Sequence, residues 1–205
     1  EERLVARQVG QGTWAPDGRG VLLLRDFDES LNGAGDLVAA DLESALEQLL
    51  HRDPQKRMIE PRWSPDGKHV AVVLNARQVG LNDGIGLFDA AGGTFVEIPI
   101  DLSGQPGSKV RGHRWISPHR IALLLLDNGE TVSTAGRVAL LDVERSELTS
   151  LLPLANVGWG ISVAGPESLI VGVGSTDQNL HEVRRDAQGR WSEPVPVTEG
   201  PFRDR

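Results

Sequence analysis

The chain lacks several residue types and sequence features, and each absence excludes a class of protein. Its 205 residues contain no cysteine, which excludes a disulfide scaffold, zinc–thiolate sites and thiol catalysis but leaves the redox compartment open. No apolar run reaches the roughly 18 residues of a membrane-spanning helix, so no membrane span is expected. The first residues, EERLVARQVG, lack the basic region and apolar core of a signal peptide. The signal or anchor of an exported protein would therefore lie outside these residues.

Basic residues are outnumbered and dispersed, which argues against nucleic acid as a partner. There are 21 Lys and Arg against 29 Asp and Glu, a formal net charge of -8, and the basic residues form no cluster that could follow a phosphate backbone. Hydrophobic residues make up 39% and charged residues 24%, a balance typical of a globular protein with a core.

Aromatic residues are scarce at 4%, with no tyrosine, yet the tryptophans recur in a repeated phrase. The phrases are GTWAPDGRGVLLL, PRWSPDGKHVAVVL, HRWISPHRIALLLL and VGWGISVAGPESLIVGV. They make Trp14, Trp63, Trp115 and Trp159 equivalent positions, spaced by 49, 52 and 44 residues. A period of about 40 to 50 residues with four strands per unit is the signature of a β-propeller, whose blades use bulky side chains to fill the space between sheets.

The repeat predicts an all-β fold: a β-propeller of four-stranded antiparallel blades, with about four complete blades in this chain, as part of a larger ring. We expect one propeller domain or propeller fragment over 1–205, with blades at 10–58, 59–110, 111–155 and 156–200. Residues 1–9 supply a strand of a preceding or closing blade. Two other arrangements remain open, a four-bladed ring closed on itself and a half ring that pairs with a second copy as a homodimer.

Local patterns predict the strands and turns within each blade. The second strands are continuous apolar runs, typical of strands covered on both faces. Pro-Asp-Gly at 16–18 and 65–67 predicts tight hairpin turns, with the aspartate acting in the turn. SALEQLLHR at 44–52 has helical spacing of its leucines, but its repeat partner at 141–152 favours a fourth strand.

WSPDGKHVAVV at 63–73 and WAPDGRGVLLL at 14–24 resemble the WD40-like PD40 repeat of the TolB-type propellers. Asp41, Asp89 and Asp142, each at the end of a third strand, match the same pattern. The resemblance covers nearly the whole chain, most closely in the first two blades. A similar repeat builds the propeller of prolyl-oligopeptidase-type serine peptidases, where it screens access to a hydrolase domain. The resemblance implies a propeller in a bacterial, periplasmic or otherwise extracytoplasmic setting, with the cytoplasm left open.

No set of residues with catalytic or metal-binding spacing accompanies the repeat. GISVAG at 160–165 places Ser162 as in a nucleophile elbow, but Ala164 replaces the required glycine and a strand follows where a helix is needed. The histidines are dispersed without HExxH spacing, and DFDESLNGAGDL at 26–37 lacks key positions of a calcium loop. We therefore expect no catalytic residue, no metal and no cofactor, and hence no enzyme activity in this chain.

Long polar loops between second and third strands, together with the crossover near 100–112, fall on one face of a propeller. Such loops are the usual place for binding residues on a rigid scaffold. Arg62 and Arg114 each precede a blade tryptophan, and they either form an anion-facing ring or pair with acidic residues in a solvated tunnel. The candidate binding residues are Arg62, Arg77, Asp83, His113, Arg114 and Asp127.

Two functional hypotheses follow from this pattern. The first is a non-catalytic propeller scaffold that binds a protein or peptide through the long-loop face, in the bacterial cell envelope. The alternative is the substrate-gating propeller domain of a serine peptidase of the prolyl-oligopeptidase type, detached from its catalytic domain.

Overall fold

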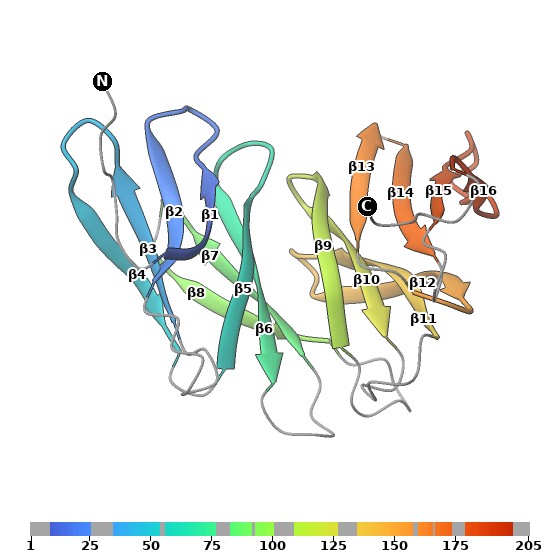
Figure 1. Ribbon diagram of the computed structural model, residues 1–205, viewed down its shortest axis with the longest axis horizontal. Coiled ribbons are helices and arrows are strands. Elements are labelled where there is room, and N and C mark those ends of the chain that lie inside the picture. The colour runs from blue at the N-terminus through green and yellow to red at the C-terminus, as the bar shows by residue number, and fades with distance from the viewer. Residues whose placement is uncertain are drawn as a thin grey trace, which may run out of the picture. The chain divides into compact units, whose positions relative to one another are not determined.

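The protein is all-β in the computed structural model, which describes residues 9–25, 35–53, 56–76, 83–91, 93–100, 109–126, 135–157, 160–165, 167–173 and 179–198. These residues form strands, turns and bends, with no helix among them, and hence no segment there with the length and apolar character of a membrane-spanning helix. The strands assemble into four antiparallel sheets of four strands each, as the sequence predicts (Figure 1). The strands are β1 (Val9–Trp14), β2 (Gly20–Arg25), β3 (Asp36–Asp41), β4 (Glu47–Arg52), β5 (Lys56–Trp63), β6 (His69–Ala76), β7 (Gly84–Asp89), β8 (Phe95–Pro99), β9 (Lys109–Ser117), β10 (Arg120–Leu126), β11 (Gly136–Asp142), β12 (Glu147–Leu154), β13 (Ile161–Gly165), β14 (Ser168–Val173), β15 (Asn179–Arg184) and β16 (Val195–Pro196).

The contacts divide the chain into two compact units, Glu1–Ile100 and Asp101–Arg205. The first unit holds sheets β1–β4 and β5–β8, and the second holds sheets β9–β12 and β13–β16. In every sheet the strands pair in chain order, which is the up-and-down meander of a propeller blade.

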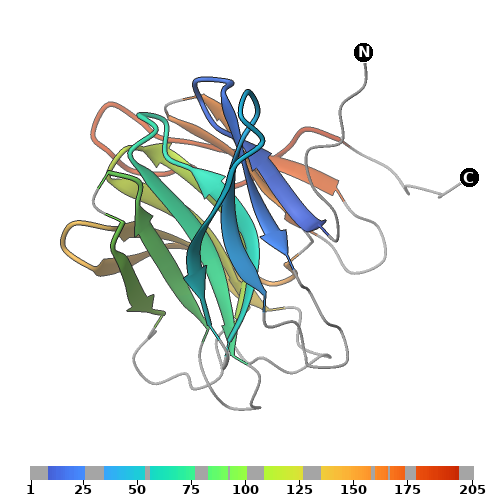
Figure 2. The same ribbon diagram turned by 90° about the vertical axis from the view of Figure 1, so that its left-hand side faces the viewer.

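In the first unit, sheet β1–β4 packs face to face on sheet β5–β8, with the first strands β1 and β5 side by side (Figure 2). The core between the two sheets takes side chains from β2, β3, β5, β6 and β7. Its buried members are Leu22, Leu24, Leu37, Met58, Val70, Val72, Leu74 and Phe88, and Trp63 and Phe95 pack against them.

The second unit repeats this arrangement. Strand β9 lies beside β13, and an apolar core fills the space between sheets β9–β12 and β13–β16. Its buried members are Ala122, Leu124, Leu126, Val138, Leu152, Leu154, Val157, Ile161, Leu169, Val171 and Val183. Trp191, from the segment before β16, packs partly buried against this core.

The apolar second strands are buried on both faces in three sheets but not in the fourth. Strands β6 and β10 are buried at successive positions from Val70 to Leu74 and from Ile121 to Leu126. Strand β14 instead alternates: Leu169 and Val171 are fully buried, whereas Ile170 between them is partly exposed. The expectation of burial on both faces is therefore confirmed for β6, β10 and residues 22–24 of β2, and it is wrong for Val21 and for β14.

The turn chemistry follows the sequence. Gly18 and Gly67 both adopt a φ of 71°, a conformation that glycine accepts without steric cost, directly after the proline and aspartate. The buried hydroxyl of Ser64 donates to Asp66 Oδ1 at 2.7 Å and accepts from the backbone N–H of His69 at 2.9 Å. The Trp-Ser-Pro-Asp-Gly phrase is thus a hydrogen-bonded hairpin, and its aspartate acts in the turn.

The third-strand aspartates also act in turns. Asp41 Oδ1 accepts hydrogen bonds from the backbone N–H and hydroxyl of Ser44, both at 2.7 Å, and these bonds lower the pKa of the Asp41 carboxyl. Asp89 and Asp142 accept in the same way from the backbone N–H of Ala91 and of Arg145. The aspartate at the end of the third strand therefore closes the hairpin to the fourth strand in the first three sheets.

Segment 44–52 forms strand β4 from Glu47, which confirms the repeat argument over local helix propensity. The equivalence of Trp159 with the other tryptophans is wrong. Strand register pairs Trp14 with Val21, Trp63 with Val70 and Trp115 with Ile121, and in the fourth sheet the same position pairs Val163 with Leu169. Val163 therefore takes the place of the tryptophan, and Trp159 lies outside the described residues. The predicted strand at 5–9 also falls outside them, except for Val9, which begins β1.

Candidate functional site

The structure describes four of the six predicted binding residues: Arg62, Asp83, His113 and Arg114. Arg77 and Asp127 lie outside the described residues, and the long loops themselves are largely outside them too. Within sheet β5–β8, Arg62 pairs with Ala71 in mid-sheet, whereas Asp83 precedes Gly84, the partner of Leu74 at the long-loop end of β6. At about 3.3 Å per residue, this register places Arg62 and Asp83 on the order of 10 Å apart along the strand.

Asp83 forms hydrogen bonds to residues at the bases of two long connections, the β6–β7 loop and the segment after β8. It is 1% exposed, its carboxylate accepts from Asn75 Nδ2 at 3.1 Å, and its backbone carbonyl accepts from the N–H of Ile100 at 3.1 Å. Asn75 lies near the end of β6, and Ile100 follows β8, so both connections start from this point. A buried carboxylate in this setting fixes where the loops leave the sheet.

The first strands β1 and β5 are joined by one specific hydrogen bond. The backbone N–H of Glu60 donates to Gln11 Oε1 at 2.6 Å, and Glu60 has a φ of 51°, a left-handed conformation unusual for a residue other than glycine. Glu60 sits in the β-bulge between Ile59 and Arg62, where the register of β5 against β6 shifts. The bulge changes the direction of β5 just before Arg62.

In the second unit His113 and Arg114 are neighbours on β9. His113 is fully buried, and its backbone carbonyl accepts from Arg114 Nη1 at 2.6 Å. Arg114 is partly exposed. The imidazole of His113 is thus part of the interior of the sheet, and Arg114 is the member of the pair that solvent reaches.

The structure also brings together charged groups that the sequence reasoning missed. At the long-loop end of sheet β1–β4, Asp36 is 9% exposed and accepts two hydrogen bonds from the Arg52 guanidinium, one of them from Nε at 2.6 Å. The Arg52 hydrogen bonds lower the pKa of the Asp36 carboxyl. Ion pairs Arg25–Glu47 and Lys56–Glu97 link this end of each sheet to positions farther along the fourth strands: Arg25 and Lys56 lie at the long-loop end, and Glu47 and Glu97 lie farther along β4 and β8. The Asp36–Arg52 pair could have been predicted from the sequence, because the two oppositely charged residues occupy facing strand ends next to loops.

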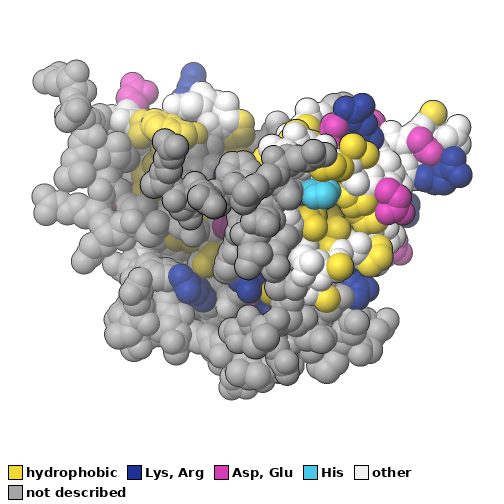
Figure 3. Space-filling view, turned by 45° about the vertical axis from the view of Figure 1, so that its right-hand side comes forward, with side chains coloured by type: hydrophobic (Ala, Val, Ile, Leu, Met, Phe, Trp, Pro, Cys, Tyr) yellow, Lys and Arg dark blue, Asp and Glu magenta, His cyan; other side chains and the backbone are white. Residues whose placement is uncertain are grey.

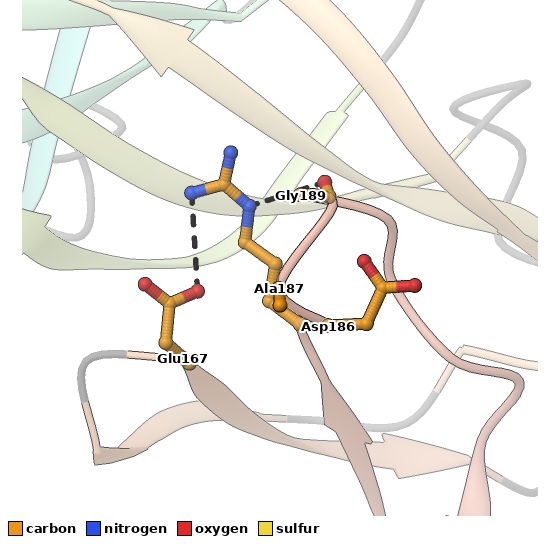
Figure 4. A pocket seen from close by; sticks show the side chains of 5 residues that line it. Glu167, Asp186, Ala187 and Gly189 are labelled. Carbon is orange, nitrogen blue, oxygen red and sulfur yellow. Dashed lines mark hydrogen bonds and ion pairs between the residues drawn. The ribbon is translucent and has the colours of Figure 1, made fainter.

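A shallow pocket of about 410 Å³ lies at the turns of the fourth sheet, lined by Glu167, Arg185, Asp186, Ala187 and Gly189 (Figure 4). The Arg185 guanidinium faces Glu167 at 3.8 Å and donates from Nε to the carbonyl of Gly189 at 3.1 Å. Asp186 accepts from the backbone N–H groups of Gln188 and Arg190, which lowers the pKa of its carboxyl. These bonds organise the turn after β15, and they account for the charged residues around the pocket.

The described part of the chain holds no set of three or more His, Asp or Glu side chains placed to bind a metal ion. Ser162 is exposed in mid-strand on β13 and pairs with Ile170, with no helix after it, so the nucleophile-elbow arrangement is absent at this serine. Of the polar groups described above, Asp83 and the Asp36–Arg52 pair lie at loop bases, and Asp186 lies in a turn.

No protein-family model matches this chain, and no curated protein matches it in sequence. Solved structures do match it over nearly its whole length. A puromycin hydrolase matches with a TM-score of 0.62 and 17% identity, covering 92% of this chain and 29% of the hydrolase. A Mycobacterium tuberculosis puromycin-hydrolyzing peptidase matches with 0.62 and 15%, covering 92% and 28%. Oligopeptidase B from Leishmania major matches with 0.65 and 13%, covering 95% and 28%.

These matches define the fold class. The chain has the all-β architecture of the propeller domains of prolyl oligopeptidases. At 13–17% identity the similarity is one of fold. The chain spans about 28–29% of the length of these solved structures.

Proposed function

We propose that this chain is the propeller part of a serine peptidase of the prolyl-oligopeptidase type, and that it gates access of peptide substrates to a catalytic domain carried elsewhere in the same protein. One observation carries the proposal. The solved structures cited above are peptidases or hydrolases, and each is matched over 92% or more of this chain by less than a third of its own length.

The polar groups of the chain suit this role. Asp83 and the Asp36–Arg52 pair hold the bases of the long loops, and a gating scaffold needs loops fixed at their bases. In this proposal the chain supplies no nucleophile or general base, and substrate selection by size is its contribution to catalysis.

The experiment compares substrates of different size on the protein that the complete reading frame encodes. Purified protein is incubated with short chromogenic peptides and with folded proteins that contain the same cleavage sequence. We expect hydrolysis of the peptides and none of the folded proteins, because the propeller excludes the larger substrates. The 205-residue chain alone serves as control and should hydrolyse neither.

Equal cleavage of peptides and folded proteins would remove the gating role while leaving a peptidase. Absence of any hydrolysis by the complete protein, under conditions where it is folded, would count against the whole proposal.

A second candidate rests on the Trp-Ser-Pro-Asp-Gly hairpin of the second blade, the phrase that resembles the TolB-type propellers. In this case the chain is a non-catalytic scaffold in an extracytoplasmic compartment that binds a protein or peptide. Arg62→Glu and Arg114→Glu should then weaken capture of a partner by the immobilised chain. Unchanged capture would exclude these two arginines from the binding face.

A further inference from the structure

Two hairpins of the first unit share one backbone geometry and differ at the residue that follows the tryptophan. In the β1–β2 hairpin the N–H of Ala15 donates to the carbonyl of Gly20 at 2.8 Å, and the N–H of Gly18 donates to the carbonyl of Ala15 at 2.9 Å. The β5–β6 hairpin repeats both bonds, with Ser64 in the place of Ala15. Both hairpins carry a Pro-Asp-Gly sequence whose glycine has a φ of 71°. The two aspartates are therefore a matched pair that differ in the side chain beside them.

Ser64 fixes the aspartate of the β5–β6 hairpin. Its hydroxyl donates to Asp66 Oδ1 at 2.7 Å, and this bond is the main cause of the lowered pKa of the Asp66 carboxyl. The backbone N–H of Lys68 donates to the same oxygen at 3.2 Å, and Lys68 Nζ lies 3.9 Å from Asp66 Oδ2. The Asp66 carboxylate is thus held in its ionised form and in one orientation.

The aspartate of the β1–β2 hairpin has a different environment. Asp17 Oδ1 accepts from the backbone N–H of Arg19 at 2.9 Å, and Ala15 has a methyl group where the other hairpin has the serine hydroxyl. Asp17 and Gly18 are both exposed, and a Cβ added at Gly18 would meet nothing within 4 Å. The peptide unit between Asp17 and Gly18 is therefore open to water.

The chain contains one more Asp-Gly sequence, Asp83-Gly84, and packing encloses it. Asp83 is 1% exposed and accepts from Asn75 Nδ2, and a Cβ added at Gly84 would lie 3.2 Å from the carbonyl oxygen of Ile98. Acidic side chains also lie at the surface of the second unit, beside basic ones (Figure 3), but none of its aspartates precedes a glycine. The three Asp-Gly sequences thus differ in how far the fold restrains their aspartates.

From this comparison we infer that Asp17 is a site of spontaneous covalent modification, at which the link to Gly18 rearranges to an isoaspartyl bond. The backbone nitrogen of Gly18 attacks Cγ of the protonated Asp17 carboxyl. The new C–N bond closes a succinimide ring, and the carboxyl hydroxyl leaves with the amide hydrogen as water. A second water molecule then opens the ring. Its attack on the side-chain carbonyl restores aspartate, and its attack on the main-chain carbonyl leaves Gly18 bonded to Cγ.

The Ser64 hydroxyl opposes this reaction at Asp66 in two ways. An ionised carboxylate is a poor electrophile, so a bond that favours the ionised form reduces the fraction that reacts. Rotation of the Asp66 Cγ toward the nitrogen of Gly67 also has to break the 2.7 Å bond from Ser64. At Asp17 neither obstacle from a serine hydroxyl is present.

The rearrangement changes the hairpin itself. The backbone between Asp17 and Gly18 gains one carbon atom, so the N–H of Gly18 no longer faces the carbonyl of Ala15. The turn then loses one of the two backbone bonds that close it, at the end of β1 beside Trp14. Water is the only other reactant, so the inference is independent of the proposed function.

The test follows the three Asp-Gly sequences in the folded 205-residue chain kept at neutral pH. Isoaspartyl residues are detected by enzymatic methyl transfer from labelled S-adenosylmethionine and located by peptide mapping, because their mass equals that of aspartate. Ala15→Ser supplies the missing hydroxyl and leaves the Asp-Gly sequence intact. Ala15→Val, which adds bulk without a hydroxyl, is the matched control. The chain unfolded in urea gives the rates without the restraint of the fold.

We expect isoaspartate to form at Asp17 at least about tenfold faster than at Asp66, since ring closure at Asp66 must break a hydrogen bond to a charged group. Ala15→Ser should slow the reaction at Asp17 to the rate at Asp66, Ala15→Val should leave it fast, and in urea the three rates should converge. Equal rates at Asp17 and Asp66 in the folded chain would overturn the inference. An Ala15→Ser variant that reacts as fast as the parent would do the same.

Discussion

The imidazole of His51 stacks on the ring of Phe95, with ring centroids 3.6 Å apart and planes 5° from parallel. His51 lies on β4 and Phe95 on β8, so the stack joins the fourth strands of the two sheets of the first unit. The hydrogen bond from the Glu60 backbone N–H to Gln11 Oε1 likewise joins the first strands, β5 and β1. The two sheets are thus fixed to each other at both edges of their shared core.

Removing the stack should destabilise the first unit. His51→Ala is expected to lower the free energy of unfolding by about 1 kcal/mol, the typical value of an aromatic pair beyond its buried area. His51→Phe keeps a stacked ring and should retain most of the stability. Urea denaturation of the two variants measures the difference, and a His51→Ala variant as stable as the parent would show that the stack contributes little.

The same histidine predicts a dependence of stability on pH. Burial lowers the pKa of His51 from its ordinary 6.5, opposed by the charge of Asp53. The folded state then binds the proton more weakly than the unfolded state, so the stabilising contribution is complete above about pH 6.5 and is lost as the pH falls below it. His51→Phe should therefore lose less stability than the parent between pH 7 and pH 5. Parallel curves for the two proteins would exclude His51 as the source.

Gly86 is required by the position of the Phe95 ring. A methyl group at Gly86 would overlap the Phe95 ring and approach Val72 Cγ2 to 2.9 Å. Gly86→Ala should therefore cost about 1–3 kcal/mol through overpacking. Gly160→Ala is the control, because its added methyl group meets nothing within 4 Å. Thermal denaturation distinguishes the two, and equal midpoints would show that Phe95 moves aside without cost.

The two N-terminal blade tryptophans should differ sharply in the 205-residue chain. Trp63 packs against the core, so Trp63→Ala is expected to cost about 2–4 kcal/mol. Trp14 is 66% exposed, so Trp14→Ala should change the stability by less than about 0.5 kcal/mol. A large loss at Trp14 in the isolated chain would mean that this ring is already packed in solution.

The hairpins between third and fourth strands hold one residue each in the left-handed conformation. Ala45, Gly93 and Ser146 follow the turn aspartate by the same interval and have φ values of 57°, 66° and 54°. Gly93→Ala should cost about 1 kcal/mol, and Ser146→Gly should raise stability by up to about 1 kcal/mol. Gly165→Ala, with open space and an ordinary φ, should have little effect. Chemical denaturation of the three variants checks the opposite signs.

Local patterns in the sequence predict much of the fold. The Pro-Asp-Gly turns, the fourth strand at 47–52 and the antiparallel four-stranded sheets all follow from short-range signals that the repeat reinforces. The fourth sheet is the exception, because its tryptophan is displaced from the register position that Val163 occupies. The spacing between tryptophans cannot detect such a shift, because it does not report which residues pair across the two strands.

The site was less predictable for a physical reason. Asp83 could be singled out as a polar residue beside a loop, but its buried hydrogen bond to Asn75 and the pairing of Asp36 with Arg52 depend on which strands are neighbours. The stack of His51 on Phe95 likewise joins two sheets, and no pattern within either strand encodes it. The first two contacts follow from strand pairing within a blade, and the stack follows from packing between blades.

The central claim is that this propeller serves a serine peptidase. The most direct measurement is labelling of the complete protein with a fluorophosphonate probe, followed by mass spectrometry to locate the modified serine. The account predicts one modified serine in the complete protein, outside these 205 residues, and no labelling of the 205-residue chain alone. A folded complete protein that takes up no probe, or a modified serine within these residues, would contradict it.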